Sequence, residues 1–156
     1  MDYFWTWRAL LSGLYSVLLT KLPPSEIYHS LCTGYAGAML ARAHLETSKP
    51  CLVTEHGIYT NERRIEIASA EWLDDDKAFS LDVTKDKHHR ELRDFWIDTF
   101  FGYSKICYEA SEHIITLYKG NQKFQIMDGA TEDKLKIIPN GIHTKRFSNI
   151  VKGEDY

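Results

Sequence analysis

Apolar positions recur at helical spacing in some segments of the chain and form short strand-like runs in others, which predicts an α/β protein. The longest helical stripe covers residues 92–110, where apolar side chains return every three or four positions. We expect its aromatic residues to lie in the core. Shorter helices are predicted at residues 34–45, from residue 62 onward, where a strand also fits, and at 121–130, where a turn also fits. Charge runs at residues 74–76 and 84–90 predict an exposed connection.

Four short segments predict the strands of one sheet. They cover residues 26–31, 51–54, 113–118 and 134–138. The first two flank a predicted helix, so they form a βαβ unit with parallel strands and a right-handed crossover. The carboxyl ends of both strands then lie at one edge of the sheet, which is where open α/β sheets bind their ligands.

The apolar segment at the amino terminus, residues 4–19, predicts a buried or half-buried helix that is ended by Pro23 and Pro24. Its uncharged stretch, residues 9–20, is too short to cross a bilayer, because a spanning helix needs about 20 apolar residues. A secretory signal would end in a small-residue cleavage site, whereas here Asp2 and Lys21 flank the segment and two prolines follow it. A helix that lies on a membrane surface, anchored by its tryptophans, is the alternative.

Composition narrows the class of protein. The chain has 156 residues, of which 44% are hydrophobic and 26% are charged, and this suits one domain or part of one. The formal net charge of -3 gives no electrostatic support for a nucleic-acid partner. Cys32, Cys51 and Cys107 lie far apart in apolar surroundings, which indicates reduced core thiols of a cytoplasmic protein. No His or Cys spacing typical of a zinc site occurs.

Polar groups follow the first two predicted strands, at the edge where the carboxyl ends meet. One strand leads into Glu55 and His56, and the other leads into Thr33 and Gly34. A strand that carries such groups at its carboxyl end usually presents them to a ligand. We therefore expect Thr33 and His29 to lie near His56. A surface turn with a solvated imidazole is the alternative.

Other common chemistries find little support in the sequence. The turn at Thr33 and Gly34 resembles one that binds phosphate at a helix amino terminus. It lacks the Lys-Ser/Thr pair of a P-loop and the full glycine pattern of a dinucleotide fold, so by itself it carries little weight. No Gly-x-Ser-x-Gly motif occurs, and no cysteine has an electropositive setting, so the usual hydrolase mechanisms are not indicated.

Three segments resemble the acceptor-side domain of group 1, family 4 glycosyltransferases, and within that family the PelF branch, which resembles the cytoplasmic polymerase of Pel exopolysaccharide. They are residues 23–35, residues 54–63 (Thr-Glu-His-Gly-Ile-Tyr-Thr-Asn-Glu-Arg) and residues 138–142 (Ile-Pro-Asn-Gly-Ile) with Phe147. Pro-Asn-Gly-Ile is typical of the broad family. Thr-Glu-His-Gly-Ile-Tyr with a following Glu-Arg is much more specific, and the resemblance covers nearly the whole chain.

This resemblance implies a Rossmann-like parallel sheet with flanking helices, as part of the N-terminal half of a GT-B glycosyltransferase. Residues 1–147 would form part of the acceptor-side domain, and residues 148–156 would begin the connector to a donor domain that is missing. The implied activity is a metal-independent, retaining transfer of a sugar, with UDP-glucose as the donor, to a growing exopolysaccharide. We therefore expect a fragment of such an enzyme that is inactive by itself.

The resemblance also implies roles for individual residues. His56 would lie in the interdomain cleft as the catalytic residue that orients the reacting sugars. Glu55 would orient His56, and Arg63 would bind a phosphate or an acidic sugar, with a plain surface position as the alternative for Arg63. The other expected substrate-binding residues line the floor of the cleft or form the hinge: His29, Thr33, Gly34, Asn140 and Gly141. A simply buried His29 is the alternative at that position.

The implied partners are a nucleotide-sugar donor, a glycan acceptor and a membrane-bound polysaccharide export complex, with no nucleic acid. No metal or other cofactor is expected, since the UDP-sugar is a substrate. The expected location is the cytoplasm, with peripheral attachment to the inner membrane. Two other functions stay open: a non-catalytic module that binds a glycan or a protein partner, and a small-molecule enzyme that binds phosphate near Thr33, Gly34 and His56.

Overall fold

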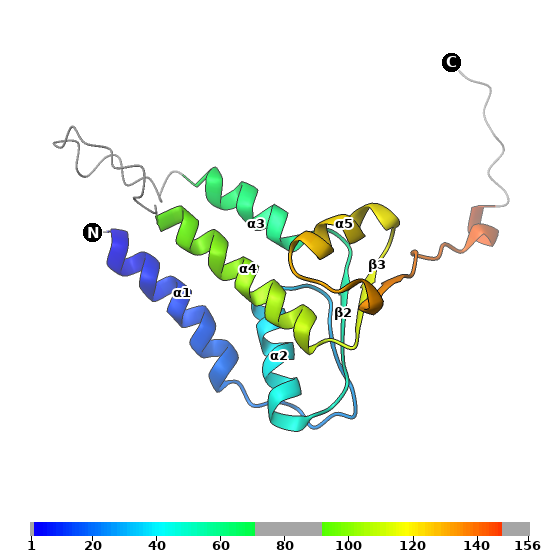
Figure 1. The fold of residues 1–156 in the computed structure, drawn as a ribbon, viewed down its shortest axis with the longest axis horizontal. Helices are drawn as coiled ribbons and strands as arrows, with labels where there is room; N and C mark the ends of the chain where they lie inside the picture. The colour runs from blue at the N-terminus through cyan, green and yellow to red at the C-terminus, as the bar shows by residue number, and fades with distance from the viewer. Residues whose placement is uncertain (1, 71–91, 148–156) are drawn as a thin grey trace, which may run out of the picture.

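A computed structural model describes residues 2–70 and 92–147 and has a four-stranded parallel sheet at its centre (Figure 1). Each strand pairs in parallel with the next one along the chain. The strands are β1 (Tyr28–Ser30), β2 (Cys51–Glu55), β3 (His113–Thr116) and β4 (Leu135–Ile137), and they lie in that order across the sheet. This arrangement confirms the predicted α/β class with a Rossmann-like sheet and flanking helices.

The helices follow the predicted order, with shifts at their ends. They are α1 (Asp2–Leu19), α2 (Tyr35–Thr47), α3 (Tyr59–Ala68), α4 (Leu92–Ala110) and α5 (Lys119–Met127), followed by short 3-10 helices at Glu132–Lys134 and Thr144–Phe147. Helix α4 has the predicted bounds. The ambiguous segments from residue 62 and at 121–130 are helical. The charge runs at residues 74–76 and 84–90, predicted to be exposed, and the connector predicted at 148–156 lie outside the described residues.

All the crossovers run in one direction across the sheet, so right-handed connections place the helices on one face. Figure 1 shows α1, α2, α3 and α4 on one side of β2 and β3. The side chains of Cys51, Val53 and Ile114 point to this side and are fully buried. On the opposite side of the sheet, the exposed His29 ring is hydrogen-bonded through Nε2 to Thr54 Oγ1 at 2.8 Å. The sequence left two expectations for His29, the floor of the cleft or simple burial. Because its ring is exposed, simple burial is excluded.

A second core lies between the helices. Phe100 and Tyr103 of α4 are buried there with Val17 of α1, Ala38 of α2 and Ile67 of α3. The prediction that the aromatic stripe of α4 is core is therefore confirmed at its centre. The stripe is wider than the buried face, since Phe95 is 38% exposed and Ile106 is 41% exposed.

The three cysteines are free thiols, as the sequence predicted, but they differ in burial. Cys51 and Cys107 are fully buried, whereas Cys32 is half-buried. Burial raises the pKa of Cys107 to about 12, and the nearby Glu55 carboxylate acts in the same direction. Gly37 faces this thiol closely, because a Cβ at Gly37 would lie 2.8 Å from Cys107 Cβ. The backbone of α2 at Gly37 therefore packs directly against the Cys107 side chain of α4.

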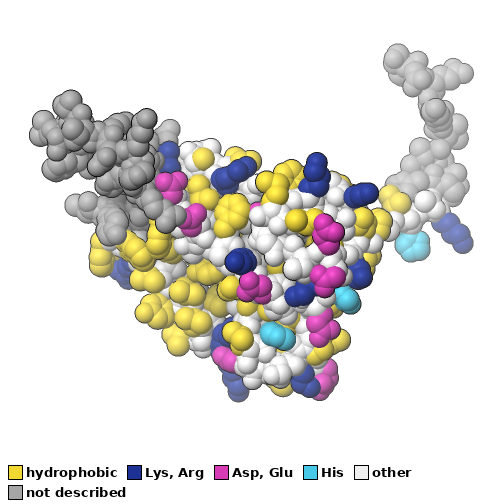
Figure 2. Space-filling model, viewed as in Figure 1, with side chains coloured by type: hydrophobic (Ala, Val, Ile, Leu, Met, Phe, Trp, Pro, Cys, Tyr) yellow, Lys and Arg dark blue, Asp and Glu magenta, His cyan; other side chains and the backbone are white. Residues whose placement is uncertain are grey.

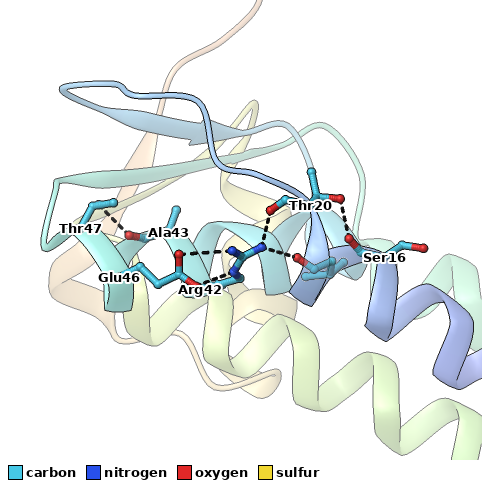
Figure 3. A network of polar contacts seen from close by, with 7 residues as sticks. Ser16, Thr20, Arg42, Ala43, Glu46 and Thr47 are labelled. Atoms are coloured by element: carbon cyan, nitrogen blue, oxygen red, sulfur yellow. Dashed lines mark hydrogen bonds and ion pairs between the residues drawn. The ribbon is translucent and has the colours of Figure 1, made fainter.

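Arg42 of α2 fixes the end of helix α1 (Figure 3). Its Nη1 donates to the carbonyl oxygens of Val17, at 2.7 Å, and Thr20, at 2.6 Å. Its Nε donates to Glu46 Oε1 at 2.6 Å. The last carbonyls of a helix have no partner within the helix, so a guanidinium is well suited to close the end of α1. The same contacts set the position of α1 relative to α2.

The outer side of α1 is apolar as well as the inner side. Leu10 and Val17 are buried, which confirms a half-buried helix. Figure 2 shows hydrophobic side chains gathered over this part of the molecule. The exposed apolar residues of the outer side are Phe4, Trp5, Leu11, Tyr15, Leu18 and Leu19. No helix in the described part of the chain is long and apolar enough to cross a membrane.

Candidate functional site at the carboxyl edge of the sheet

The carboxyl ends of the four parallel strands meet at one edge of the sheet, and the predicted site residues follow these ends. Gly34 follows β1, His56 follows β2 and Asn140 follows β4. The register pairs Glu55 of β2 with Thr116 of β3, so the loops after β2 and β3 leave the sheet side by side. The fold thus brings the predicted residues Thr33, Gly34, Glu55, His56, Asn140 and Gly141 to a single edge, whereas His29 lies within β1 and Arg63 lies within α3. The side chains at the edge divide into a buried and an exposed layer.

Glu55 belongs to the buried layer, with only 1% of its surface exposed. Its Oε2 accepts hydrogen bonds from Tyr108 Oη at 2.6 Å and from Gln125 Nε2 at 3.0 Å. Its Oε1 accepts a hydrogen bond from Thr33 Oγ1 at 3.3 Å. One carboxylate therefore connects β2 to helices α4 and α5 and to the loop before α2. None of these donors is His56, so Glu55 holds the surrounding segments and not the imidazole.

The electrostatics of this cluster follow from its burial. Burial raises the pKa of the Glu55 carboxyl, while the hydrogen bonds from Tyr108, Gln125, Thr33 and the Tyr59 backbone act in the opposite direction. Burial, followed by the negative charge of Glu55, raises the pKa of the Tyr108 hydroxyl. A carboxyl group away from water is costly to ionise, and donors that point at it offset part of the cost. The phenol thus remains a donor.

His56 belongs to the exposed layer, although it is the next residue in the chain. Its imidazole is exposed and forms no hydrogen bond within the described residues. Its backbone carbonyl accepts a hydrogen bond from Asn121 Nδ2 at 3.4 Å. The Asn121 side chain therefore holds the backbone at His56, while the imidazole faces solvent.

Gly34 and Tyr59 pack together where the loop after β1 meets the start of α3. Gly34 has a φ of 72°, and a Cβ there would lie 2.4 Å from the Tyr59 ring. Only glycine adopts such a backbone without strain. Thr33, just before it, is fully buried and donates its hydroxyl to Glu55. The Thr33 side chain is thus turned away from the edge where a ligand would bind.

Arg63 lies along the first turns of α3. Its guanidinium carbon is 5.1 Å from the centroid of the Tyr59 ring, and its Nη2 donates to Glu66 Oε1 at 2.7 Å. Its Nε is buried without a hydrogen-bond partner among the described residues. Arg63 is therefore engaged with its own helix, and its unpartnered Nε is not exposed to solvent.

Asn140 and Gly141 lie where the chain leaves β4. The Ile138 amide donates to the Thr116 carbonyl at 2.9 Å, and this is the last hydrogen bond of the ladder before Pro139. Proline cannot continue a ladder, so the strand ends as predicted. No strand follows within residues 138–147, so the chain leaves the sheet here without forming a hairpin in the described part. Both residues are exposed, and a Cβ at Gly141 would meet nothing within 4 Å.

Sequence reasoning missed most of the buried layer. Tyr108 and Gln125 lie 53 and 70 residues from their partner Glu55 along the chain. One signal was available, because Asn121 and Gln125 are two amides one turn apart on α5. Both are buried, and buried amides normally have hydrogen-bond partners.

A separate hydrogen bond joins helices α3 and α5. Thr60 of α3 donates its hydroxyl to the Asp128 carboxylate at the end of α5. Burial raises the pKa of Asp128, whereas the Thr60 hydrogen bond and the charge of Arg64 lower it. Helix α3, which begins just after His56, is therefore tied to α5 at its own first turn.

The described residues hold no group of three or more His, Cys, Asp or Glu side chains that could bind a metal ion. A hollow of about 630 Å³ lies between α5 and the start of β4, lined by Lys119, Lys123, Ile126 and Leu135 among others. His56 does not line it. The predicted site is therefore an open edge, and not a closed cavity.

Comparison with known proteins places the chain in a family. Residues 1–133 match the model of a domain of unknown function, DUF3492, which is associated with glycosyltransferase-like proteins. No curated protein and no solved structure matches the chain. Because the match covers most of the sequence, the chain belongs to the DUF3492 domain family.

Proposed function

We propose that this chain is the acceptor-side part of a retaining glycosyltransferase of the PelF branch, one that transfers glucose from UDP-glucose to a growing exopolysaccharide. The observation that carries the proposal is the turn at His56. An exposed imidazole stands at the carboxyl edge of a parallel sheet, on a backbone that buried contacts hold in place. Ligands of open α/β sheets bind at that edge. The family match supports the same class of enzyme.

In the proposed reaction, an acceptor hydroxyl oxygen bonds to the anomeric carbon of the donor sugar as the bond from that carbon to UDP breaks. UDP leaves with the bonding electrons, and the hydroxyl proton passes to its phosphate. The role of His56 is to bind and orient the acceptor, since a neutral imidazole donates at one nitrogen and accepts at the other. Correct placement of reacting groups is itself a large part of catalysis.

The residues around His56 divide this work. Glu55, Thr33 and Gly34 hold the loops in place from below, as their burial and packing show. Arg63, on the first turns of α3, is the residue that this proposal assigns to a phosphate or an acidic sugar, through its planar guanidinium. Asn140 and Gly141 lead from β4 towards the donor-binding half that the proposal requires.

The proposal extends to partners and location. The donor nucleotide would bind chiefly to a second domain, no metal ion takes part, and the product would pass to a membrane-bound polysaccharide export complex. The reaction belongs in the cytoplasm, with peripheral attachment to the inner membrane. A module that binds glycans without transferring sugar is the competing function, and both functions require a glycan site on this chain.

A pair of titrations tests the proposal. Cellotetraose, maltotetraose and chitotetraose should shift backbone NMR signals of the loop after β2, whereas UDP-glucose should bind weakly or not at all. Binding of UDP-glucose with micromolar affinity, worth about 8 kcal/mol, would place the donor site on this chain and overturn the assignment. In a longer protein that includes the donor domain, His56→Ala should lower transfer and leave UDP affinity unchanged.

A further inference from the structure

Tyr118 lies two residues beyond the end of β3, in the connection that leaves the sheet next to the His56 turn. Glu55 pairs with Thr116 in the register, so the residues that follow, His56 and Tyr118 among them, leave the sheet on adjacent paths. Tyr118 has an extended backbone, with φ of −154° and ψ of 158°, and directly precedes α5. Its side chain is 57% exposed. An aromatic ring and an imidazole are thus presented at the same edge.

The ring of Tyr118 is supported and not loose. A Cβ at Gly120 would lie 2.7 Å from ring carbon Cε2 and 3.1 Å from Cδ2, so the ring rests against the Gly120 backbone. Asn121, in the same turn, donates to the His56 carbonyl at 3.4 Å. The platform under Tyr118 is therefore linked to the backbone of His56 by a direct contact.

We infer that Tyr118 is a second wall of the acceptor site and stacks against a neutral pyranose ring of the glycan. A pyranose has a face of C–H groups and a rim of hydroxyls. The negative face of an aromatic ring attracts C–H groups, and the imidazole nearby can bind the hydroxyls. Small-molecule sites commonly combine aromatic walls with a few such polar groups. This inference rests on the proposed function and adds a specificity-determining residue to it.

The chemistry of the pair favours a neutral sugar. A phenol ring offers a stacking surface and one hydroxyl, and it carries no positive charge to bind a phosphate. Tyr15 shows what an exposed tyrosine without this setting looks like. It is also 57% exposed, but it lies on the outer side of α1, far along the chain from the loops of the carboxyl edge. Tyr15 is therefore the matched control.

The test measures the dissociation constant of the same tetrasaccharides by NMR titration of the full chain. Tyr118→Ala should raise it about tenfold, or about 1.4 kcal/mol. Tyr118→Phe and Tyr118→Trp should retain binding because stacking needs the ring and not the hydroxyl, and Tyr15→Ala should change nothing. In the wild-type chain, nuclear Overhauser contacts should join Tyr118 ring protons to sugar C–H protons. This measurement does not depend on whether any variant folds.

The outcomes separate the two ideas. Tetrasaccharide binding that is unaffected by Tyr118→Ala, or that shows no contacts to the Tyr118 ring, overturns the inference and leaves the proposed function standing. A wild-type chain that binds none of the tetrasaccharides overturns the proposed function, and the inference with it.

Discussion

Glu55 and His56 are neighbours in the chain and opposites in the structure. The Glu55 carboxylate is almost fully buried and accepts hydrogen bonds from Tyr108, Gln125 and Thr33. The His56 imidazole faces solvent and has no hydrogen-bond partner in the part of the chain that the structure describes. Successive side chains of a strand point to opposite sides, and this alternation separates the two at the end of β2. Within this polar motif, Glu55 supports the carboxyl edge of the sheet, and His56 is the group that the edge exposes to solvent.

The two layers depend on the rest of the fold to different degrees. A buried carboxylate is stabilising only when its hydrogen-bond donors are in place. Here the side-chain donors lie 22, 53 and 70 residues away, so the buried layer forms only when the whole sheet is assembled. The exposed position of His56 depends only on the local turn that follows β2. Substitutions in the first layer should therefore change stability, and those in the second should change binding.

The largest effect is expected for Glu55→Ala. The substitution leaves the buried groups of Tyr108, Gln125 and Thr33 without their acceptor, which should lower the free energy of unfolding by about 3 kcal/mol. Urea unfolding followed by circular dichroism measures it. Glu112→Ala, at an exposed position, is the control and should stay within about 0.5 kcal/mol of wild type. Equal stability of the two variants would mean that the Glu55 cluster does not support the edge.

Gly34→Ala should have the next largest effect. The backbone there has a φ of 72°, and the new Cβ would lie 2.4 Å from the Tyr59 ring, so strain and displacement of the ring should cost about 2 kcal/mol. Gly141→Ala tests the other glycine predicted for the site. A Cβ there meets nothing within 4 Å, so its thermal midpoint should match wild type. Similar losses in both variants would contradict the close contact between Gly34 and Tyr59.

A smaller effect, visible as a pH dependence, is expected for Glu55→Gln. Burial raises the folded-state pKa of Glu55, so the folded protein binds this proton more tightly than the unfolded chain does. The stability contributed by the group is then greatest below the unfolded pKa of about 4.3 and is lost as pH rises through the folded value.

Unfolding free energies of wild type and Glu55→Gln across that pH range supply the measurement. The advantage of wild type should shrink as pH rises, because glutamine does not titrate. Other acids, including Asp128 with its raised pKa, titrate in both proteins and cancel in the comparison. An advantage that instead grows with pH would show that the hydrogen bonds to Glu55 outweigh its burial.

The sequence predicted elements whose signal is local. The stripe of α4 is continuous over its whole length, and its bounds were correct. The first strand was predicted too long, since β1 covers only Tyr28–Ser30. Ile27 and Leu31, which extended the apolar run, are 56% and 67% exposed. An apolar run shows which residues can enter a strand, but pairing with β2 decides which of them do.

The candidate site was predicted by position and missed in detail. Its edge followed from the parallel strands, whereas the inward turn of Thr33 depends on a carboxylate 22 residues away. Tyr118 carried no signal of its own, because in the sequence it is only the last residue of the strand predicted at 113–118. Its place near the His56 turn follows only from the register that pairs β3 with β2. Contacts of this kind depend on tertiary structure, so local patterns do not contain them.

The smallest effect on stability is expected for His56→Ala, and it tests the comparison most directly. The ring is exposed and only the backbone carbonyl of this residue accepts a hydrogen bond, so alanine keeps the one contact that holds the turn. The free energy of unfolding should stay within about 0.5 kcal/mol of wild type. Asn121→Ala, which removes the donor to that carbonyl from a position that is 3% exposed, should cost about 1 kcal/mol. Urea unfolding of both variants decides the matter. If His56→Ala proved the more destabilising of the two, the imidazole would belong to the buried layer, and the division of the edge into a supporting and a presenting layer would be wrong.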